Sequence, residues 1–369
     1  MNEISTRKKT TQEIISQPGE LLQDKQDILN DFYLASLSRQ LSYAGRKEVL
    51  NGRAKFGIFG DGKELAQIAM AKLFRNGDWR SGYYRDQTFM LYLGLLTPAE
   101  FFAQLYGDTN SGNNPCSSGR NFNNHYTTPN YTEDGTWMNL MNQKNSSGDV
   151  SPTAGQMPRL LGLAYASKLF RQNPELKGYA HLSNNGNEVA FGSIGDASTS
   201  EGHFFETINA AGVLQVPLAV SVWDDGYGIS VPIEYQTTKQ SISEALKGFE
   251  ADAQNKGILI YKARGWNYPE LISVFSEGIS KCRNEHVPVL FHIRELTQPL
   301  GHSTSGSHER YKSKKRLGWE AEFDPIVKMQ EWLIESGIAT EKELDSITAK
   351  ATKEAAEGRE IAWKNFKKV

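Results

Sequence analysis

Residues 195–230 read "GDASTSEGHFFETINAAGVLQVPLAVSVWDDGYGIS", and this stretch decides the fold. The apolar segment that leads into it, "EVAFGSIGD" at 188–196, predicts a buried strand that ends in Gly-Asp. A helical pattern follows at 201–215, and a second apolar segment, "PLAVSVW", runs into the adjacent carboxylates Asp224 and Asp225. Strands that alternate with helices are typical of a parallel sheet. The stretch therefore predicts a strand–helix–strand unit with acidic residues at both strand ends.

The same alternation continues on both sides of this unit. The spacing of apolar residues predicts helices over 27–46, 64–74, 156–170, 244–258 and 268–285, and strands over 259–265 and 288–296. We expect an α/β fold in which helices cover both faces of a parallel sheet and helical extensions lie at both chain ends. The expected division is an N-terminal arm at 1–25, an α/β domain at 26–320 and a C-terminal helical extension at 321–369.

A long polar segment at 107–148 interrupts this alternation. It is rich in Asn, Gly, Ser and Thr, but it also carries Phe, Tyr and Trp side chains that can pack. Loops longer than about 15 residues are uncommon and are usually functional or disordered. We expect an ordered surface loop near a functional site, and an inert insertion is the alternative.

The bulk composition excludes several classes of function. The chain has 369 residues with 38% hydrophobic and 11% aromatic content, enough for one large or two medium domains. A formal net charge of −2 gives no reason to expect a nucleic-acid or membrane partner. The two cysteines and seven scattered histidines form neither a disulfide framework nor a zinc-ligand spacing. The polar N-terminus lacks a signal-peptide core, and no apolar run reaches membrane-spanning length, so we expect a soluble, cytoplasmic protein.

The acidic residues at the two strand ends predict a metal-dependent anion site. Ligands of parallel sheets bind beyond the carboxyl ends of the strands, where Asp196 and Asp225 can face one crevice. Helix N-termini at the same edge favour an anion such as phosphate. Magnesium reconciles the carboxylates with that anion, and the glycines beside Tyr227 let its backbone carbonyl supply a third oxygen. The alternative is that Asp196 only caps a helix and the aspartate pair only starts a turn.

An earlier Gly-Asp-Gly at 60–62 has a different interpretation. The segment before it, "GRAKFGIFG", is mixed and glycine-rich rather than strand-like. No Asn or Asp ends a second strand at a comparable spacing after it. We interpret this segment as a loop that leads into the helix at 64–74.

The unit at 195–230 resembles the cofactor motif of thiamine-diphosphate enzymes, which is Gly-Asp-Gly followed farther along the chain by two asparagines. It is similar to this motif in the alpha subunit of the thiamine-dependent component of 2-oxo acid dehydrogenases, a family that includes the branched-chain 2-oxo acid and pyruvate dehydrogenases. Further stretches agree in order: "GDWRSGYYRDQTFMLYLG", "SPTAGQMPRLLGLAYASKL", "GHSTSGSHERY" and "WEAEFDPIVKMQEWLIESGIATEKEL". The resemblance covers roughly residues 28–360.

The resemblance implies a set of site residues. The side chains of Asp196 and Asp225 and the backbone carbonyl of Tyr227 would hold magnesium. His302 would contact the diphosphate and assist acyl transfer, a proton-transfer role that an imidazole can fill near neutral pH. The residues implied to bind thiamine diphosphate are Tyr84, Arg85, Ser151, Thr153, Gly195, Asp196, Ala197, Ser198, Asp225, Tyr227 and His302. The alternatives are a mobile, solvated loop around His302 and a surface turn in which Arg85 pairs with Asp86.

Two residues depart from the family motif. Ala197 stands where the motif has its second glycine, a small change if φ is negative there. Asp225 stands where the motif has a neutral asparagine, and it adds a negative charge beside the diphosphate. Either magnesium and Arg85 neutralise that charge, or cofactor affinity is reduced.

The function implied by the resemblance is that of a 2-oxo acid dehydrogenase alpha subunit or alpha half. The activity would be thiamine-dependent oxidative decarboxylation of a 2-oxo acid, with acyl transfer to the lipoyl group of an acyltransferase component. The segment "GHSTSG" favours a branched-chain substrate. A beta subunit or a fused C-terminal half would supply the glutamate that activates the cofactor, so we expect an alpha–beta heterotetramer or a longer polypeptide. The alternatives are a pyruvate- or acetoin-specific relative and a cofactor-free assembly subunit in which Asp225 has destroyed the site.

Overall fold

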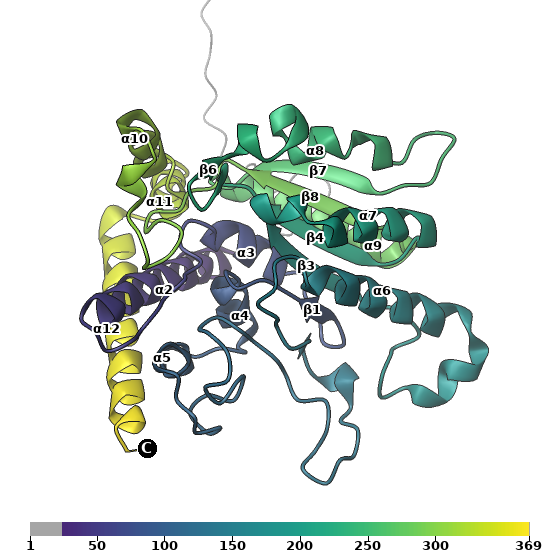
Figure 1. The fold of residues 1–369 in the computed structure, drawn as a ribbon, viewed down its shortest axis with the longest axis horizontal. Coiled ribbons are helices and arrows are strands. Elements are labelled where there is room, and N and C mark those ends of the chain that lie inside the picture. The colour runs from purple at the N-terminus through teal and green to yellow at the C-terminus, as the bar shows by residue number, and fades with distance from the viewer. Residues whose placement is uncertain (1–23, 369) are drawn as a thin grey trace, which may run out of the picture.

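The computed structural model describes residues 24–368, which are arranged around a six-stranded sheet (Figure 1). The strand order is β2-β1-β3-β4-β8-β7, and every pair of neighbours is parallel. The strands are β1 (Trp79–Ser81), β2 (Asn145–Ser146), β3 (Ala190–Gly195), β4 (Leu218–Trp223), β7 (Leu259–Arg264) and β8 (Val289–Arg294). β3 and β4 are direct neighbours and end in register, Gly195 opposite Trp223. The expected α/β fold with a parallel sheet is confirmed.

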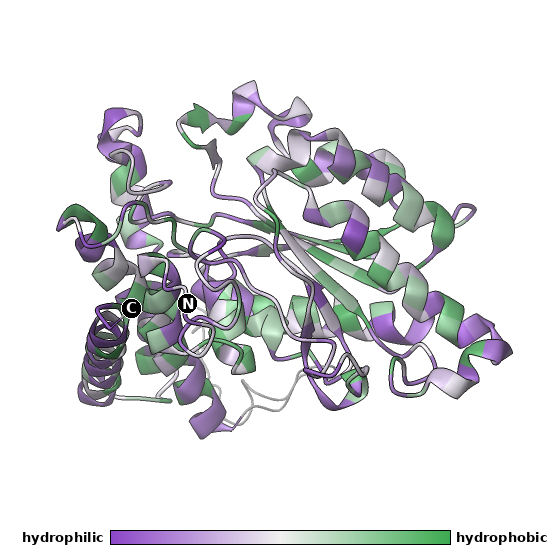
Figure 2. Ribbon diagram, turned by 60° about the horizontal axis from the view of Figure 1, so that its bottom comes forward, coloured by the Kyte–Doolittle hydropathy of each residue, from purple (hydrophilic) through white to green (hydrophobic). Residues whose placement is uncertain are grey.

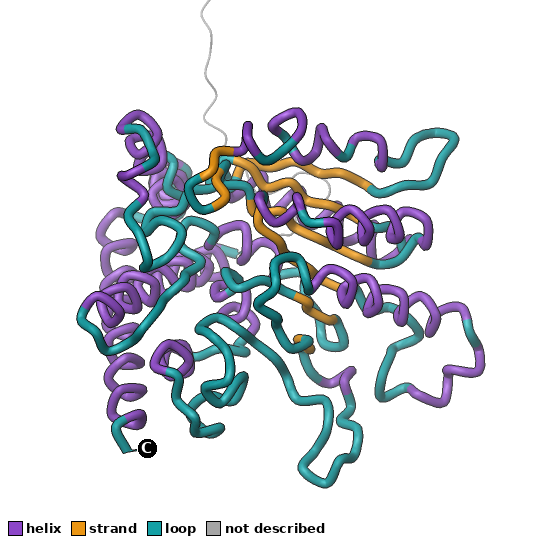
Figure 3. Tube along the Cα trace, in the orientation of Figure 1, coloured by secondary structure: helices purple, strands orange, loops and turns teal. Residues whose placement is uncertain are grey.

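Helices cover both faces of the sheet (Figures 1 and 3). One face carries α6 (Gln156–Gln172), α7 (Gly202–Leu214) and α8 (Ile242–Ala245), and the other carries α3 (Glu64–Ala71) and α9 (Tyr268–Glu285). Alternate side chains of a strand point to opposite faces. Accordingly Val220 and Val222 of β4 pack with the first group of helices, whereas Ala219 and Trp223 pack with the second. Because both faces are covered, β3 and β4 are buried along their whole length. Figure 2 shows the long strands of the sheet largely in white and green, the colours of intermediate and hydrophobic residues.

Helices from the two ends of the chain pack together beside the sheet. They are α2 (Lys25–Leu50), α4 (Gln87–Leu93), α5 (Pro98–Tyr106), α10 (Lys314–Glu322), α11 (Pro325–Glu335) and α12 (Glu341–Phe366). α12 lies against α2 and α5. Gly358 permits this approach, since a Cβ there would lie 2.5 Å from the Cβ of Pro98. The arm expected at 1–25 falls almost entirely outside the described residues.

The helix expected over 244–258 is wrong. α8 ends at Ala245, and a short 3-10 turn covers Lys247–Phe249. The chain then turns back because Asp252 Oδ1 accepts hydrogen bonds from the backbone N–H groups of Gln254 and Asn255, at 2.8 and 2.7 Å. Such local side-chain bonds compete with helix formation. The short strands β1 and β2 were not expected either.

The segment 107–148 forms an ordered loop within the described chain. It includes a 3-10 turn at Leu140–Asn142 and β2, whose residues pair with β1 at the edge of the sheet. Figure 3 shows this segment as long stretches of loop below the sheet. Among the helices of residues 24–368, none is long and apolar enough to cross a membrane.

Candidate cofactor and metal site

A cavity of about 480 Å³ lies at the carboxyl ends of β3 and β4. This volume is in the range of small-molecule and cofactor sites, roughly 300–1,000 Å³. Its position agrees with the rule that ligands of parallel sheets bind beyond the strand ends. The structure brings the predicted residues together here: Tyr84, Arg85, Thr153, Gly195, Asp196, Ala197, Ser198, Asp225, Tyr227 and His302 all line the cavity, and Ser151 does not.

Asp196 follows the last residue of β3 and points its carboxylate into a buried environment. Its side chain does not cap the 3-10 turn that follows (Ala197–Ser200), so the alternative role as a cap is not observed. Its Oδ2 is buried and has no hydrogen-bond partner among residues 24–368. Burial, and then the charges of Asp225 and Asp224, raise the pKa of Asp196 well above its ordinary value. A buried oxygen with free lone pairs beside further carboxylates is suited to a divalent cation. Ala197 has negative φ, so the motif's second glycine is not required.

The two adjacent aspartates at the end of β4 point to different partners. Asp224 Oδ1 accepts from the backbone N–H of Gly226 at 2.9 Å, and its Oδ2 lies 2.8 Å from Nε2 of His292. The backbone N–H of Ser243 donates to Nδ1 of His292 at 3.3 Å, so Nε2 is the nitrogen that carries the hydrogen and donates to Asp224. Asp224 is thus satisfied inside the protein, and Asp225 is left to face the cavity.

Asp225 forms an ion pair with Lys63, a residue that the sequence analysis missed. Nζ of Lys63 lies 2.9 Å from Oδ2 of Asp225, and the backbone N–H of Tyr227 donates to Oδ1 at 3.2 Å. Burial opposes ionisation, but Lys63, Lys312 and Arg85 together hold the pKa of Asp225 below its ordinary value. The segment 60–62 is a loop that leads into α3, as the sequence indicated, and it places the next residue, Lys63, at the cavity. The available signal was a lysine directly between a Gly-Asp-Gly turn and an apolar helix.

Arg85 is buried beside the cavity and binds backbone carbonyls. Its Nη1 donates to the carbonyl of Phe59 at 2.5 Å and its Nη2 to that of His302 at 2.8 Å, and its guanidinium lies 5.2 Å from the ring centre of Tyr84. Only 3% of its surface is exposed. Asp86 pairs with Arg80 instead, so Tyr84 and Arg85 do not form the surface turn given as the alternative. The other lining residues that were missed are Ile58, Tyr83, Trp223, Gly228, Ile229, Val231, Gln236, Gln298, Tyr311 and Lys312.

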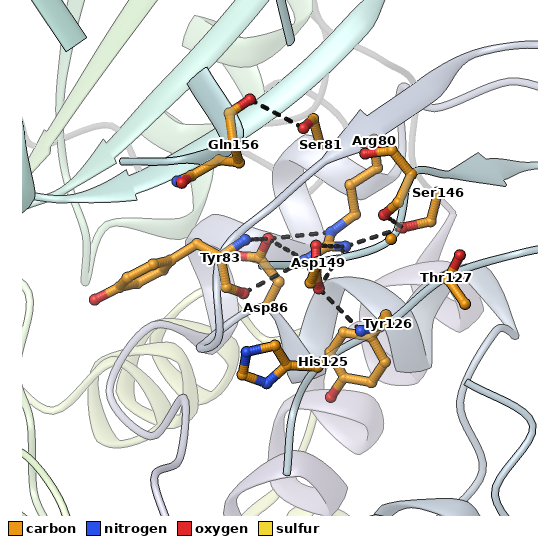
Figure 4. Close-up of polar contacts among 12 residues, drawn as sticks. Arg80, Ser81, Tyr83, Asp86, His125, Tyr126, Thr127, Ser146, Asp149 and Gln156 are labelled. Carbon is orange, nitrogen blue, oxygen red and sulfur yellow. Dashed lines mark hydrogen bonds and ion pairs between the residues drawn. The ribbon is translucent and has the colours of Figure 1, made fainter. Parts of the chain in front are cut away.

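A buried ionic network fixes the turn that carries Tyr83, Tyr84 and Arg85 (Figure 4). Arg80 donates from Nη2 to Asp86 Oδ2 at 2.8 Å and from Nη1 to Asp149 Oδ1 at 3.0 Å. The same Asp86 oxygen accepts from the backbone N–H of Tyr83 at 3.0 Å. Through this oxygen, the position of the turn depends on Arg80.

The loop 107–148 contacts the site through buried asparagines. Asn123 and Asn124 donate from Nδ2 to the carbonyl of Ile58, a cavity residue, at 2.7 and 2.8 Å. Nδ1 of His125 lies 3.2 Å from the carbonyl of Asn123, so it carries the hydrogen, and Nε2 accepts from the hydroxyl of Ser151 at 3.0 Å. The loop therefore lies near the site, as expected. Ser151 is placed beside this loop, and its predicted contact with the cofactor stays a prediction.

The segment that carries His302 is hydrogen-bonded to other parts of the protein, which does not favour the alternative of a mobile, solvated loop. Besides the bond from Arg85 to the carbonyl of His302, the backbone N–H of Thr304 donates to the carbonyl of Gly57 at 2.9 Å, and Arg46 Nη1 donates to the carbonyl of Leu300 at 2.9 Å. Burial and the neighbouring cation Arg85 lower the pKa of His302 to about 4. Its ring is therefore neutral at neutral pH and can either donate or accept a proton.

This lowered pKa predicts a pH dependence of stability. Because the unfolded His302 takes up a proton below about pH 6.5 and the folded one does not until about pH 4, the free energy of unfolding falls as the pH falls through this window. Histidine NMR titration of the cofactor-free chain should show two resonances that titrate near pH 4, of which one is lost in His302→Gln. His286, whose pKa is also lowered to about 4, remains in that variant as an internal reference. A His302 resonance that titrates at or above its ordinary value contradicts the assignment.

Comparison with known proteins identifies the family of this chain. The family profile described as "Dehydrogenase E1 component" matches residues 34–368. The chain is 26% identical over 315 residues to 2-oxoisovalerate dehydrogenase subunit alpha 1, mitochondrial, of Arabidopsis thaliana, covering 85% of this chain and 58% of that protein. It is 24% identical to the mouse mitochondrial alpha subunit (89% of this chain, 65% of that one) and 25% identical to 2-oxoisovalerate dehydrogenase subunit alpha of Bacillus subtilis (strain 168), with 83% of each chain covered.

The share of each chain that these matches cover decides how far the family assignment extends. The chain spans about three fifths of the length of the plant and mouse relatives. The family match, by contrast, takes in the whole sheet, the cavity and the C-terminal helices. The chain belongs to the dehydrogenase E1 component family.

Proposed function

We propose that this chain is the alpha subunit, or the alpha half, of a thiamine-diphosphate-dependent 2-oxo acid dehydrogenase that acts on a branched-chain 2-oxo acid. The observation that carries the proposal is the pairing of Asp196, with its unpartnered Oδ2, and Asp225 at the ends of adjacent strands around one cavity. The relatives named as 2-oxoisovalerate dehydrogenase alpha subunits support the branched-chain substrate.

The residues present fit thiamine diphosphate and magnesium. Asp196, Asp225 and the carbonyl of Tyr227 are the magnesium ligands in this proposal, and the cations Arg85 and Lys312 offset the charge of a diphosphate in the same cavity. Gly195 lets the side chain of Tyr83 lie close to the end of β3, since a Cβ at this position would be 2.7 Å from the hydroxyl of Tyr83. When bound, the cofactor would supply the electron sink for decarboxylation.

The chain's own residues have separable roles in this proposal. Asp196 and Asp225 fix the metal and, through it, the anionic end of the cofactor. The buried position of Arg85 excludes water from that end. The neutral ring of His302 can hold or release a proton at the reacting end of the cavity during acyl transfer.

The proposed activity also needs a residue from a beta subunit or from a fused C-terminal half. The lining residues within the described chain include two aspartates and no glutamate. This supports the proposal that the activating glutamate comes from a beta subunit or a fused C-terminal half, and that a lipoyl-bearing acyltransferase accepts the acyl group.

The test is a substrate comparison on the assembled enzyme. Co-expressed with the beta subunit from the neighbouring reading frame, or with the continuation of its own, the chain should decarboxylate 3-methyl-2-oxobutanoate with a higher kcat/KM than pyruvate. Activity should require added thiamine diphosphate and magnesium. Preference for pyruvate or acetoin would contradict the branched-chain assignment, and no calorimetric heat with both cofactors would favour the assembly-subunit alternative.

A further inference from the structure

Lys63 is a buried lysine whose hydrogen-bonding capacity is fully used inside the protein. Its Nζ donates to Oδ2 of Asp225 at 2.9 Å, to the carbonyl of Thr297 at 2.9 Å and to Oε1 of Gln298 at 2.6 Å. An ammonium group has three hydrogens, so none is left for a ligand. Only 1% of the residue's surface is exposed. Lys63 therefore acts on the cavity through Asp225 rather than by direct contact with an anion.

The backbone holds Lys63 in this position. Gly62 has φ of +83°, and a Cβ there would lie 2.1 Å from the carbonyl oxygen of Thr297. The turn before α3 therefore packs closely against the segment at 297–298. This segment supplies two of the three acceptors of Lys63, and the third is the carboxylate of Asp225 at the end of β4.

The ion pair changes the charge that Asp225 presents to the cavity. The motif that this sequence resembles has a neutral asparagine at position 225. Here a carboxylate and an ammonium group form a pair with no net charge. Among residues 24–368, Oδ1 of Asp225 accepts one hydrogen bond, from the backbone N–H of Tyr227 at 3.2 Å, so this oxygen keeps the capacity to bind a further group at the cavity that Asp225 lines. The pair reproduces the charge of the motif's amide with two residues that lie far apart in the sequence.

We propose that Lys63 is a positioning residue that makes Asp225 an electrically neutral metal ligand and thereby sets the balance between metal and diphosphate affinity. This inference rests on the proposed function. An unpaired carboxylate at 225 would attract a divalent cation and repel the diphosphate. An unpaired ammonium at 63 would repel the divalent cation and attract the diphosphate.

The test is a double-mutant cycle with two binding measurements. Lys63→Met, Asp225→Asn and the double variant are compared with the unaltered full-length chain, assembled with its partner. Affinity for Mn²⁺ alone is measured by electron paramagnetic resonance, and affinity for thiamine diphosphate at saturating Mg²⁺ by calorimetry. Lys353→Met, at an exposed position on α12, is the control and should change neither.

The two single substitutions are expected to shift the affinity for Mn²⁺ in opposite directions. Lys63→Met should bind Mn²⁺ about tenfold more tightly and thiamine diphosphate about tenfold more weakly, and Asp225→Asn should bind Mn²⁺ about tenfold more weakly. The double variant should return to within about threefold of the unaltered chain for both ligands. Asp225→Asn removes no volume, so it tests the proposal even if Lys63→Met does not fold.

Three outcomes overturn the inference, and one of them also removes the proposed function. Mn²⁺ affinity that is unchanged or raised in Asp225→Asn overturns the neutral-ligand role alone. A double variant that stays about tenfold or more away from the unaltered chain for either ligand does the same, because removing both charges would then not restore the affinity. If the unaltered assembly takes up no thiamine diphosphate, the proposed function and this inference fail together.

Discussion

Asp196→Asn is expected to lower the affinity for thiamine diphosphate at saturating Mg²⁺ by about 100-fold or more, because groups that only support a metal ligand already cost 10–100-fold when lost. The amide keeps the shape of the side chain but removes the charge of the one site carboxylate whose Oδ2 has no partner in the described chain. Calorimetry on the assembled enzyme measures this loss. Asp345→Asn, an exposed change on α12, is the control.

The same substitution is expected to leave the free energy of unfolding of the metal-free protein unchanged or to raise it. Asp196 is buried next to Asp225 and Asp224, and its pKa is raised, so the folded chain binds a proton there more tightly than the unfolded chain does. In metal-free buffer the free energy of unfolding therefore rises as the pH falls through that raised pKa. Asp196→Asn lacks this charge and should unfold at an equal or higher urea concentration at neutral pH. A variant that is less stable without metal yet binds cofactor normally would show that Asp196 has a structural role only.

Local patterns were sufficient to predict that two acidic residues meet at the edge of the sheet. Asp196 and Asp225 each follow an apolar run, and the positions of strand ends in a parallel sheet bring such residues to one edge. β3 and β4 are adjacent and end in register, so this expectation depends only on the single helical connection between them. Asp224 precedes Asp225 directly, but its carboxylate contacts His292 instead of lining the cavity.

Long-range partners were not predictable in the same way. Lys63 and Asp225 are 162 positions apart, and nothing in the local sequence of either residue specifies the other. β2 is two residues long, too short for any periodicity to be recognised. The segment 244–258 has helical spacing, but the side chain of Asp252 binds the backbone of the next residues and ends the helix early.

The ionic network in which Arg80 binds Asp86 and Asp149 was not predictable from the sequence either. Arg80 lies on β1, Asp86 in the turn after it, and Asp149 after β2, so the three residues meet only because β1 and β2 pair at the sheet edge. Burial raises the pKa of Asp149, whereas the charge of Arg80 lowers it, so Arg80 favours the ionised carboxylate. The network is buried, unlike the partly exposed pair of Arg264 and Glu270.

Arg80→Met is expected to lower the free energy of unfolding by about 3–5 kcal/mol, because it leaves Asp86 and Asp149 buried without their shared cation. The matched variant Arg264→Met breaks a surface pair and should cost about 1 kcal/mol or less. Urea unfolding at neutral pH compares the two. Since Asp86 also holds the backbone N–H of Tyr83, the Arg80 variant should lose cofactor affinity as well, whereas the Arg264 variant should not. Equal stability losses in the two variants would mean that water enters the network and screens the carboxylates, and that the turn carrying Tyr84 and Arg85 is positioned by other contacts.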